Sequence, residues 1–413
     1  PPPPPPPPPP PFFFQAAAGI RHQPRSRGLG DVYKRQVVLT LGLAKGHSAD
    51  WPQLLGPRAN GISTETGLLS AWPSGGPKVL WKKPIGTGYS APSIRDGRLV
   101  LFHRIGNEEI VEALDPKTAK PVWRHAYPTR YRDLFGYNNG PRCTPLLTEK
   151  YCFTFGAEGV LLCLDAATGK PVWQRSIVID AGLNLNESID QIGISANRNK
   201  SKEWGYSSSP LVVNNLVTVS AGGDNGKSLV SYDRATGKQA WSGGGSRAGY
   251  SSPRIVKLHG DPQILIFNQD GLAAHSPTNG SIVWEFEWNV PYPHVSVPLT
   301  LPDNKVLLSL GYGKGSKMLQ VNFNEGKFSA VELWKSNRMK AKFTNLIFHN
   351  DHIFGLDDGM FACIDIERGR RKWKEGRYGH GQILLRGNHI LVMAENGDVI
   401  LLEANAEQHV ELT

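Results

Sequence analysis

Short runs that are apolar, or that alternate between apolar and polar residues, recur along this chain. The clearest are Leu99–Phe102, Tyr151–Phe155, Leu216–Ser220, Ile264–Phe267, Val306–Leu310, His352–Phe354 and Ile390–Met393. Pairs such as Asp96-Gly97 and Asp270-Gly271 separate them and are typical of tight turns between antiparallel strands. The pattern therefore predicts an all-β chain of short strands with almost no helix.

These runs belong to a unit that repeats along the chain and ends in a tryptophan. Four copies read ALDPKTAKPVW (Ala113–Trp123), CLDAATGKPVW (Cys163–Trp173), SYDRATGKQAW (Ser231–Trp241) and CIDIERGRRKW (Cys363–Trp373), and two looser copies end at Trp284 and Trp334. The gaps between successive tryptophans are 50, 68, 43, 50 and 39 residues. Self-similarity at about 40–50 residues, with four short strands in each unit, predicts a β-propeller.

The residues of the unit fit a strand, a turn and a second strand. In the second copy, Asp165 can accept backbone N–H bonds within the turn, and Gly169 supplies a left-handed backbone conformation. Val172 and Trp173 then begin the outer strand. A large ring at this point can cover the gap between neighbouring blades, so we expect each repeat tryptophan to be a buried packing residue.

The pattern A-x-D-x-x-T-G-K-x-x-W resembles the tryptophan-docking repeat of the pyrroloquinoline-quinone (PQQ) propellers. Ala119 replaces the glycine in the first copy, and Glu367-Arg368 departs from the pattern in the last. The opening Asp50-Trp51-Pro52-Gln53 and the pair Leu80-Trp81 resemble the start of the BamB-like envelope proteins of this repeat class. The resemblance covers roughly residues 50–413. It implies a quinoprotein-like propeller, a platform that enzymes and scaffolds share.

Seven strand groups can be counted between Ser90 and Thr413. We expect the first strand of each group to line a central channel, at Gly88–Pro92, Gly140–Pro145, Gly205–Pro210, Gly249–Pro253, His294–Pro298, Phe343–Leu346 and Gly379–Gln382. The segment around Trp81 is then an orphan outer strand, which we expect to complete a closing blade with strands from the C-terminus. Because the chain stops near the outer strand of the seventh unit, we expect an eight-bladed ring that lacks the last strands of its closing blade.

The first 49 residues are expected to lie outside the propeller. Residues 1–36 begin with eleven prolines and end in SRGLGDVYKRQ, which resembles translated sequencing-adapter sequence; the alternative is a genuine polyproline II arm. Residues 37–49 begin with VVLTLGLA and end in small residues, like the tail of a secretory signal peptide. The remainder divides into an N-terminal extension at 50–77 and the propeller at 78–413. No stretch approaches the roughly 20 apolar residues that a transmembrane helix needs.

Charge and cysteine content narrow the possible partners. The formal net charge is +10, but residues 1–49 contain six Lys or Arg and one Asp, so residues 50–413 hold 40 basic and 35 acidic side chains. No basic run with interleaved aromatic residues occurs, so nucleic-acid binding is not supported. Cys143, Cys152, Cys163 and Cys363 are never adjacent in sequence. We expect buried free thiols, although an oxidising compartment would also allow a disulfide.

No motif in the sequence identifies a catalytic or metal centre. Neither HExxH nor GxSxG occurs, and the glycine-rich stretch Gly311–Gly315 follows a strand without a helix after it, as in a β-turn. The quinoprotein dehydrogenases that the repeat resembles carry adjacent cysteines, a calcium held by Glu and Asn, and a catalytic Asp. Adjacent cysteines are missing here, and no local motif matches the other residues. We therefore expect no catalytic residue, no metal and no cofactor, with PQQ and calcium only under the enzyme alternative.

Two long connections, Arg124–Arg142 and Val178–Trp204, indicate where binding occurs. Each joins an outer strand to the next inner strand, so both should open on one face of the ring. The candidate binding residues near that rim are Tyr89, Tyr131, Arg132, Asn138, Arg142, Tyr206, Tyr250, His294 and His380. The candidate docking tryptophans are Trp81, Trp123, Trp173, Trp241, Trp284, Trp334 and Trp373.

The leading functional hypothesis is a secreted or periplasmic, monomeric and non-catalytic scaffold that binds a protein or another envelope component. One alternative is a PQQ-dependent alcohol-type dehydrogenase or a diverged quinone binder. Another is a polysaccharide-binding propeller that uses the aromatic residues of its long loops.

Overall fold

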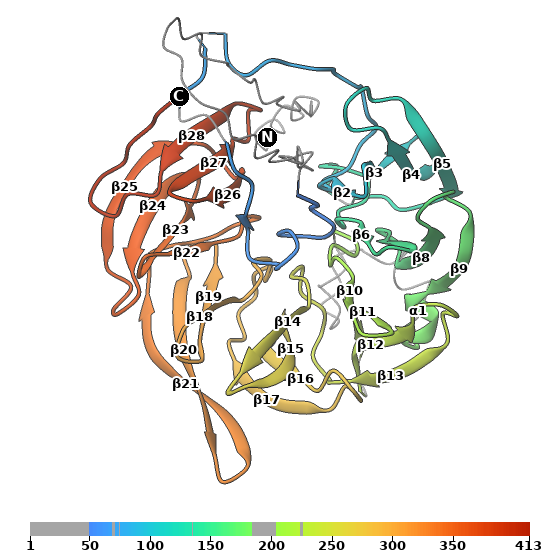
Figure 1. Ribbon diagram of the computed structural model, residues 1–413. Helices are drawn as coiled ribbons and strands as arrows, with labels where there is room; N and C mark the ends of the chain where they lie inside the picture. Colours follow the sequence, from blue (N-terminus) through green and yellow to red (C-terminus); the bar gives the residue numbers. More distant parts are fainter. Residues whose placement is uncertain (1–48, 68–70, 74, 134, 184–203, 224–225) are drawn as a thin grey trace, which may run out of the picture.

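The computed structural model describes residues 49–67, 71–73, 75–133, 135–183, 204–223 and 226–413. The expected disordered segment at 1–36 and nearly all of the expected signal-peptide remnant at 37–49 lie outside these residues. Within the described residues, 28 β-strands form seven four-stranded sheets set around a central axis (Figure 1). One helix of four residues, α1 (Ile177–Asp180), accompanies them. The predicted all-β propeller of four-stranded units is confirmed, whereas an eighth blade is not confirmed and stays a prediction.

Six sheets are antiparallel and use consecutive strands, from the axis outwards. The first three are β2 (Ser93–Arg95), β3 (Arg98–Ile105), β4 (Glu108–Leu114) and β5 (Pro121–Pro128); β6 (Leu146–Leu147), β7 (Tyr151–Phe155), β8 (Val160–Asp165) and β9 (Pro171–Ser176); and β10 (Leu211–Val213), β11 (Leu216–Gly223), β12 (Lys227–Asp233) and β13 (Gln239–Gly243). The next three are β14 (Arg254–Leu258), β15 (Asp261–Asn268), β16 (Gly271–His275) and β17 (Ile282–Glu287); β18 (Leu299–Leu301), β19 (Lys305–Leu310), β20 (Gly315–Asn324) and β21 (Lys327–Ser336); and β22 (Ile347–His349), β23 (His352–Asp357), β24 (Met360–Asp365) and β25 (Arg371–Arg377).

The seventh sheet contains strands from both ends of the described chain. Its order is β1 (Ile62–Ser63), β26 (Gln382–Arg386), β27 (His389–Met393) and β28 (Val399–Glu403), and β1 pairs with β26 in parallel. This inner-edge strand from the N-terminal extension was not predicted from the sequence. On the outer edge of the sheet, backbone bonds join Val410 and Leu412 to β28. The segment around Trp81, which was expected to complete an eighth, closing blade, forms no strand among the described residues, and its pairing stays a prediction.

The innermost strands begin later than the sequence pattern suggested. Five of the expected inner segments end at a proline, and the inner strand starts at the residue after it, as at Ser93 after Pro92. The small polar residues of these segments form hydrogen bonds to the corresponding segment of the neighbouring sheet, and they do not pair with a strand of their own sheet. The Ser209 N–H donates to Ser252 Oγ at 2.8 Å, and Ser251 Oγ donates to the Ser296 carbonyl at 3.0 Å. The segments therefore form a belt of bonds that links successive sheets around the channel.

The turn in each repeat unit contacts the tryptophan of the preceding sheet. This contact explains why the Asp, the Gly and the Trp recur at the same spacing within the repeats. Asp165 Oδ1 accepts the backbone N–H groups of Ala167 and Thr168, as expected for the turn. The indole N–H of Trp123 donates to the Ala166 carbonyl in that turn, at 3.1 Å. A Cβ at Gly169, where φ is +69°, would lie 2.5 Å from the Trp123 ring. Glycine is therefore required here both by the backbone conformation and by the ring above it.

The same docking hydrogen bond recurs around the ring, except at Trp284 and at Trp241, whose indole N–H has no hydrogen-bond partner among the described residues. The indole N–H groups of Trp81, Trp173, Trp334 and Trp373 donate to the carbonyls of Pro116, Arg234, Ile366 and Asn405 at 2.9–3.0 Å. Trp284 instead bonds Gln263 of its own sheet, since the next sheet has the long β20–β21 hairpin in place of the turn. Trp123, Trp241, Trp284 and Trp373 are buried, whereas Trp81, Trp173 and Trp334 keep partial exposure.

The N-terminal extension crosses the channel. Trp51 forms an antiparallel bridge with Ile94 of β2, and the Leu147 N–H of β6 donates to the Pro52 carbonyl at 2.8 Å. After a turn, the Gly61 carbonyl accepts the Leu385 N–H of β26 at 2.9 Å. Residues 51–63 therefore run from one side of the ring to the other, where Figure 1 shows them in blue inside the ring. We call residues 51–63 the crossing segment.

Replacing Trp123 with alanine should destabilise the protein by about 3–5 kcal/mol, because a large buried ring and its docking bond are both lost. The measurement is the free energy of unfolding from chemical denaturation of the full chain. Val122→Ala is the control, since the neighbouring Val122 side chain is 50% exposed and should change stability little. Equal effects of the two substitutions would contradict the docking role of Trp123.

Candidate functional site

The connection between β5 and β6 is held against the ring by a buried arginine. Arg104 of β3 donates to the carbonyls of Tyr131 at 2.7 Å and Asn139 at 2.9 Å, and its Nε donates to the Gly106 carbonyl at 2.8 Å. These three bonds use the fixed fork of the guanidinium. The loop is therefore a fixed part of the surface, although it is long.

Asp133 organises the turn at the tip of this loop. Its carboxylate accepts the N–H groups of Phe135 at 3.0 Å and Asn138 at 3.2 Å, and it pairs with Arg142 at 3.0 Å. Arg142 also donates to the carbonyls of Gly140 and Asn138. Both side chains of the ion pair are almost fully buried, so Arg142 acts as a brace for the loop rather than as a free binding group.

The turn that Asp133 organises presents two aromatic side chains to solvent. Phe135 is 54% exposed and Tyr137 is 55% exposed, and their rings stack at 6.1 Å. Phe135 also stacks on Trp204 at 5.2 Å, and Trp204 meets Tyr250 edge-on at 5.6 Å. Trp204 ends the second long connection, so the two connections meet on one face. Residues 184–203 of the second connection lie outside the described residues.

Across the channel, two further aromatic residues have unusual backbone conformations. Tyr312 has φ +57° and Phe343 has φ +65°, in the left-handed region that bulky residues rarely adopt. Phe343 is 48% exposed, and Lys342 Nζ lies 4.7 Å from the Tyr312 ring centroid and 5.4 Å from the Phe343 centroid. Such backbone strain costs about 1–3 kcal/mol per residue and is concentrated at functional sites. The backbone strain at Tyr312 and Phe343 makes this part of the rim a candidate site.

Tyr137, on the β5–β6 connection, affects the pKa of tyrosines on both sides of the channel opening. Burial raises the pKa of both Tyr89 and Tyr312, and the Tyr137 phenol adds to both shifts. The Glu395 carboxylate also raises the pKa of Tyr89 and accepts the N–H of His380 at 2.9 Å. His380 in turn meets the Phe343 ring edge-on at 5.8 Å. We define the aromatic mouth as the site formed by Tyr89, Phe135, Tyr137, Tyr312, Lys342, Phe343 and His380.

The expected rim residues divide into exposed and buried groups. Tyr89 and Arg132 are exposed, and Asn138 and His380 are partly exposed. The buried group is Tyr131, Arg142, Tyr206, Tyr250 and His294. Sequence reasoning missed Phe135, Tyr137, Tyr312 and Phe343. Tyr137 was recognisable as a loop residue, but the positive φ of Tyr312 and Phe343 has no sequence signal.

His294 is the clearest example of an expected rim residue that packs inside. Its Nδ1 lies 2.5 Å from the Asn268 carbonyl, and its ring stacks on Phe267 at 4.3 Å. The side chain is fully buried, and burial lowers the pKa of His294 to about 4. The residue therefore stabilises the fold as a neutral imidazole and is not available to a ligand at the mouth.

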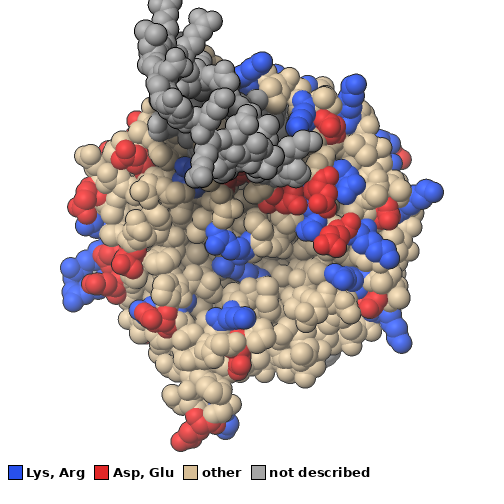
Figure 2. All heavy atoms as spheres, viewed as in Figure 1, with Lys and Arg blue, Asp and Glu red and all other residues tan. Residues whose placement is uncertain are grey.

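The described residues contain no group of three or more His, Cys, Asp or Glu side chains placed to hold a metal ion. Cys143, Cys152, Cys163 and Cys363 are buried free thiols in the structure. Burial raises the pKa of Cys143, Cys163 and Cys363 to about 12, so these thiols stay protonated at neutral pH. On the face shown in Figure 2, Lys and Arg side chains lie in the hollow near the centre, and most acidic side chains lie farther out.

The crossing segment lies toward the end of the channel opposite the mouth. In the six sheets of consecutive strands, the inner strand begins near the mouth and ends at the turn to its second strand, on the other face. Asp50, which directly precedes the crossing segment, accepts the Asp96 N–H in the turn after β2. Arg386, at the end of β26, donates to the Glu65 carbonyl beyond the segment. A ligand at the aromatic mouth would therefore not have to displace this segment.

Comparison with known proteins identifies the repeat class. Residues 107–408 match the family model described as outer membrane protein assembly factor BamB. This chain belongs to that family. A search of curated protein sequences gives no match. No helix in the described part of the chain is long and apolar enough to cross a bilayer.

The solved structures that share the fold include a BamB and a methanol dehydrogenase. BamB from Moraxella catarrhalis has a TM-score of 0.52 and 18% sequence identity, over 79% of this chain and 89% of that protein. A europium-containing methanol dehydrogenase has a TM-score of 0.51 and 11% identity, over 80% of this chain and 77% of that enzyme. At these identities the likeness shows a common propeller fold alone.

The buried His294 predicts a pH-dependent stability. Its folded pKa of about 4 lies below the unfolded value of about 6.5, so its contribution is complete above pH 6.5 and is lost as the pH falls toward 4. Between pH 7 and pH 4 the wild type should lose about 3 kcal/mol more of its unfolding free energy than His294→Gln does, because the substitution removes only the His294 contribution. Unfolding free energies measured from pH 7 to pH 4 test this, with the partly exposed His352→Gln as control. The same slope in wild type and His294→Gln would contradict it.

Proposed function

We propose that this protein is a non-catalytic scaffold of the cell envelope that binds a protein partner at the aromatic mouth. The observation that carries the proposal is the exposure of Tyr89, Phe135, Tyr137 and Phe343 by 45–55% around one end of the channel. Aromatic side chains are enriched at the centres of protein interfaces because they bury a large area with few rotatable bonds. Four such residues gathered on one rim mark an interaction surface rather than chance exposure.

The way the rings are held supports a pre-formed surface. Phe135 is fixed by its N–H bond to Asp133 and by stacking on Trp204. The Tyr312 ring stacks on Tyr292 at 5.2 Å, and the Phe343 ring meets His380 edge-on at 5.8 Å. Because the mouth loses little freedom on binding, contact area converts efficiently into affinity. Lys342 adds a cation between two rings, which favours a partner with acidic or carbonyl groups at its centre.

The envelope location is part of the same proposal. The matched family is described as an outer membrane protein assembly factor. The apolar run at residues 37–44, followed by small residues, fits the end of a secretory signal. Both observations support a secreted or periplasmic protein.

The double substitution Tyr137→Ser with Phe343→Asn should reduce partner recovery at least about tenfold. Each lost aromatic anchor is worth about 1–2 kcal/mol at an interface, and 1.4 kcal/mol corresponds to a factor of ten. Asparagine is chosen at position 343 because it tolerates the left-handed conformation. The measurement is quantitative recovery of envelope proteins on the immobilised full chain.

Phe323→Ser is the matched control, since Phe323 is a 43% exposed aromatic near the tip of the β20–β21 hairpin, which projects from the ring in Figure 1. The control should keep wild-type recovery. Unchanged recovery by a folded double variant would contradict the proposal. Loss of recovery on adding soluble envelope polysaccharide would favour the polysaccharide alternative instead.

The non-catalytic part of the proposal has its own test. We expect the full chain, mixed with PQQ and calcium, to show no dye-linked oxidation of alcohols and no quinone absorbance that remains with the protein after gel filtration. Both signals are measured in the visible and ultraviolet range against a quinoprotein dehydrogenase as a positive control. Clear turnover by this chain would overturn the scaffold assignment.

A further inference from the structure

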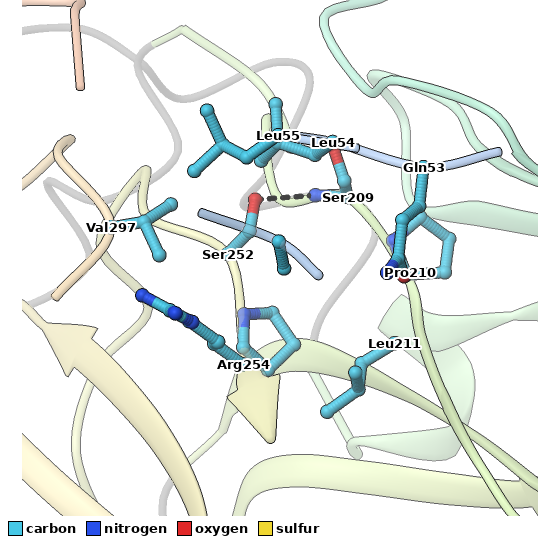
Figure 3. A pocket seen from close by; sticks show the side chains of 11 residues that line it. Gln53, Leu54, Leu55, Ser209, Pro210, Leu211, Ser252, Arg254 and Val297 are labelled. Carbon is cyan, nitrogen blue, oxygen red and sulfur yellow. Dashed lines mark hydrogen bonds between the residues drawn. The ribbon is translucent and has the colours of Figure 1, made fainter. Parts of the chain in front are cut away.

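A small cavity lies inside the ring between the crossing segment and the inner ends of two sheets. Its volume is about 20 Å³, and its walls include Leu54, Leu55, Ser252, Arg254 and Val297. Figure 3 shows the Arg254 side chain beside Ser252 and Val297, below the leucines of the crossing segment. A cavity of this size holds one water molecule or one monatomic ion.

Arg254 is a buried cation that pairs with no carboxylate in the described part of the chain. The residue is 8% exposed, and its guanidinium makes one hydrogen bond, from Nη1 to the Pro298 carbonyl at 3.1 Å. Its Nε has no hydrogen-bond partner among the described residues. No ion pair of the described residues includes Arg254. Burial lowers the pKa of Arg254 to about 10. The side chain still carries its charge at neutral pH.

A buried guanidinium without a counter-charge destabilises the folded state unless another group neutralises its charge. An ion taken out of water loses several kcal/mol of solvation, and an unpaired one regains little of it. Arg142 and Arg104, which hold the β5–β6 loop, both have partners for their guanidinium groups. Arg142 pairs with Asp133, and Arg104 donates to three carbonyls. Arg254 therefore differs from both, because it combines burial, a free N–H and an adjoining cavity.

A second donor faces the same space. The Ser252 hydroxyl oxygen accepts the Ser209 N–H at 2.8 Å, so its own proton remains for another acceptor. The remaining walls are mainly apolar, from Leu54, Leu55 and Val297. A guanidinium N–H and a hydroxyl that converge in an apolar cavity of one-ion volume suit a small, weakly hydrated anion.

We propose that Arg254 and Ser252 bind one small monovalent anion of the chloride class in this cavity. The anion completes the hydrogen bonding of the guanidinium and neutralises the buried charge. Since Leu54 and Leu55 form the opposite wall, the bound anion also favours the docked position of the crossing segment. The site is independent of the aromatic mouth and of any partner bound there.

The test is the melting temperature of the full chain in sodium chloride against sodium gluconate at equal ionic strength. Gluconate is too large for the cavity, so only chloride should stabilise the wild type, by roughly 2–5 °C at concentrations well above the dissociation constant. Arg254→Met should lose this difference, because it removes the charge and keeps much of the side-chain length. Lys257→Met is the matched control on the same strand, since Lys257 is exposed, and it should keep the wild-type difference.

A crystallographic measurement keeps the proposal testable if Arg254→Met does not fold. Wild-type crystals grown in sodium bromide should show an anomalous scattering peak in the cavity next to the Arg254 guanidinium. Absence of that peak would overturn the proposal. Equal melting temperatures of the wild type in the two salts, or a chloride effect that persists in folded Arg254→Met, would also overturn it.

Discussion

The seven sheets share no continuous ladder with one another, so the ring depends on how side chains of one sheet dock on the next. The main docking contact is a tryptophan on an outer strand that lies on a glycine and donates to a carbonyl in the neighbouring turn. At Trp123 this contact combines a buried ring with a 3.1 Å hydrogen bond to Ala166. Near the axis, serine bonds such as that from Ser209 to Ser252 form a second link between sheets. Together the outer and inner contacts fix the angle between neighbouring blades, which the strand pairing within each blade leaves free.

A fixed ring allows the loops at one end to carry a defined surface. The β5–β6 connection is long, yet Arg104 and the Arg142–Asp133 pair hold it with buried polar contacts. Its tip then presents Phe135 and Tyr137 toward rings that come from other sheets. The strain at Tyr312 and Phe343 persists because the surrounding sheets determine where these residues sit. The mouth is thus assembled from residues far apart in the sequence, and it exists only when the blades are docked.

The sequence alone predicted the features that depend on local pattern. The strand alternation, the Asp165 turn and the position of Gly169 follow from periodicity and turn chemistry, and the structure confirms them. The start of the inner strands was misplaced, because the segments before each proline have strand-like composition but bond between sheets. The inner-edge pairing of Ile62–Ser63 with β26 joins residues more than 300 positions apart, and no local signal marks it. His294 was expected at the rim because its neighbours suggested an inner strand, whereas tertiary packing turns its ring inward against Phe267.

Amide hydrogen exchange of the full chain, compared between wild type and Trp173→Ala, tests most directly whether tryptophan docking holds neighbouring sheets together. Trp173 belongs to β9 but donates to Arg234, in the turn between β12 and β13 of the next sheet. The account predicts faster exchange in both sheets, including residues 233–238, with little change in the distant sheet of β26 to β28. Faster exchange confined to the sheet that contains Trp173 would contradict it.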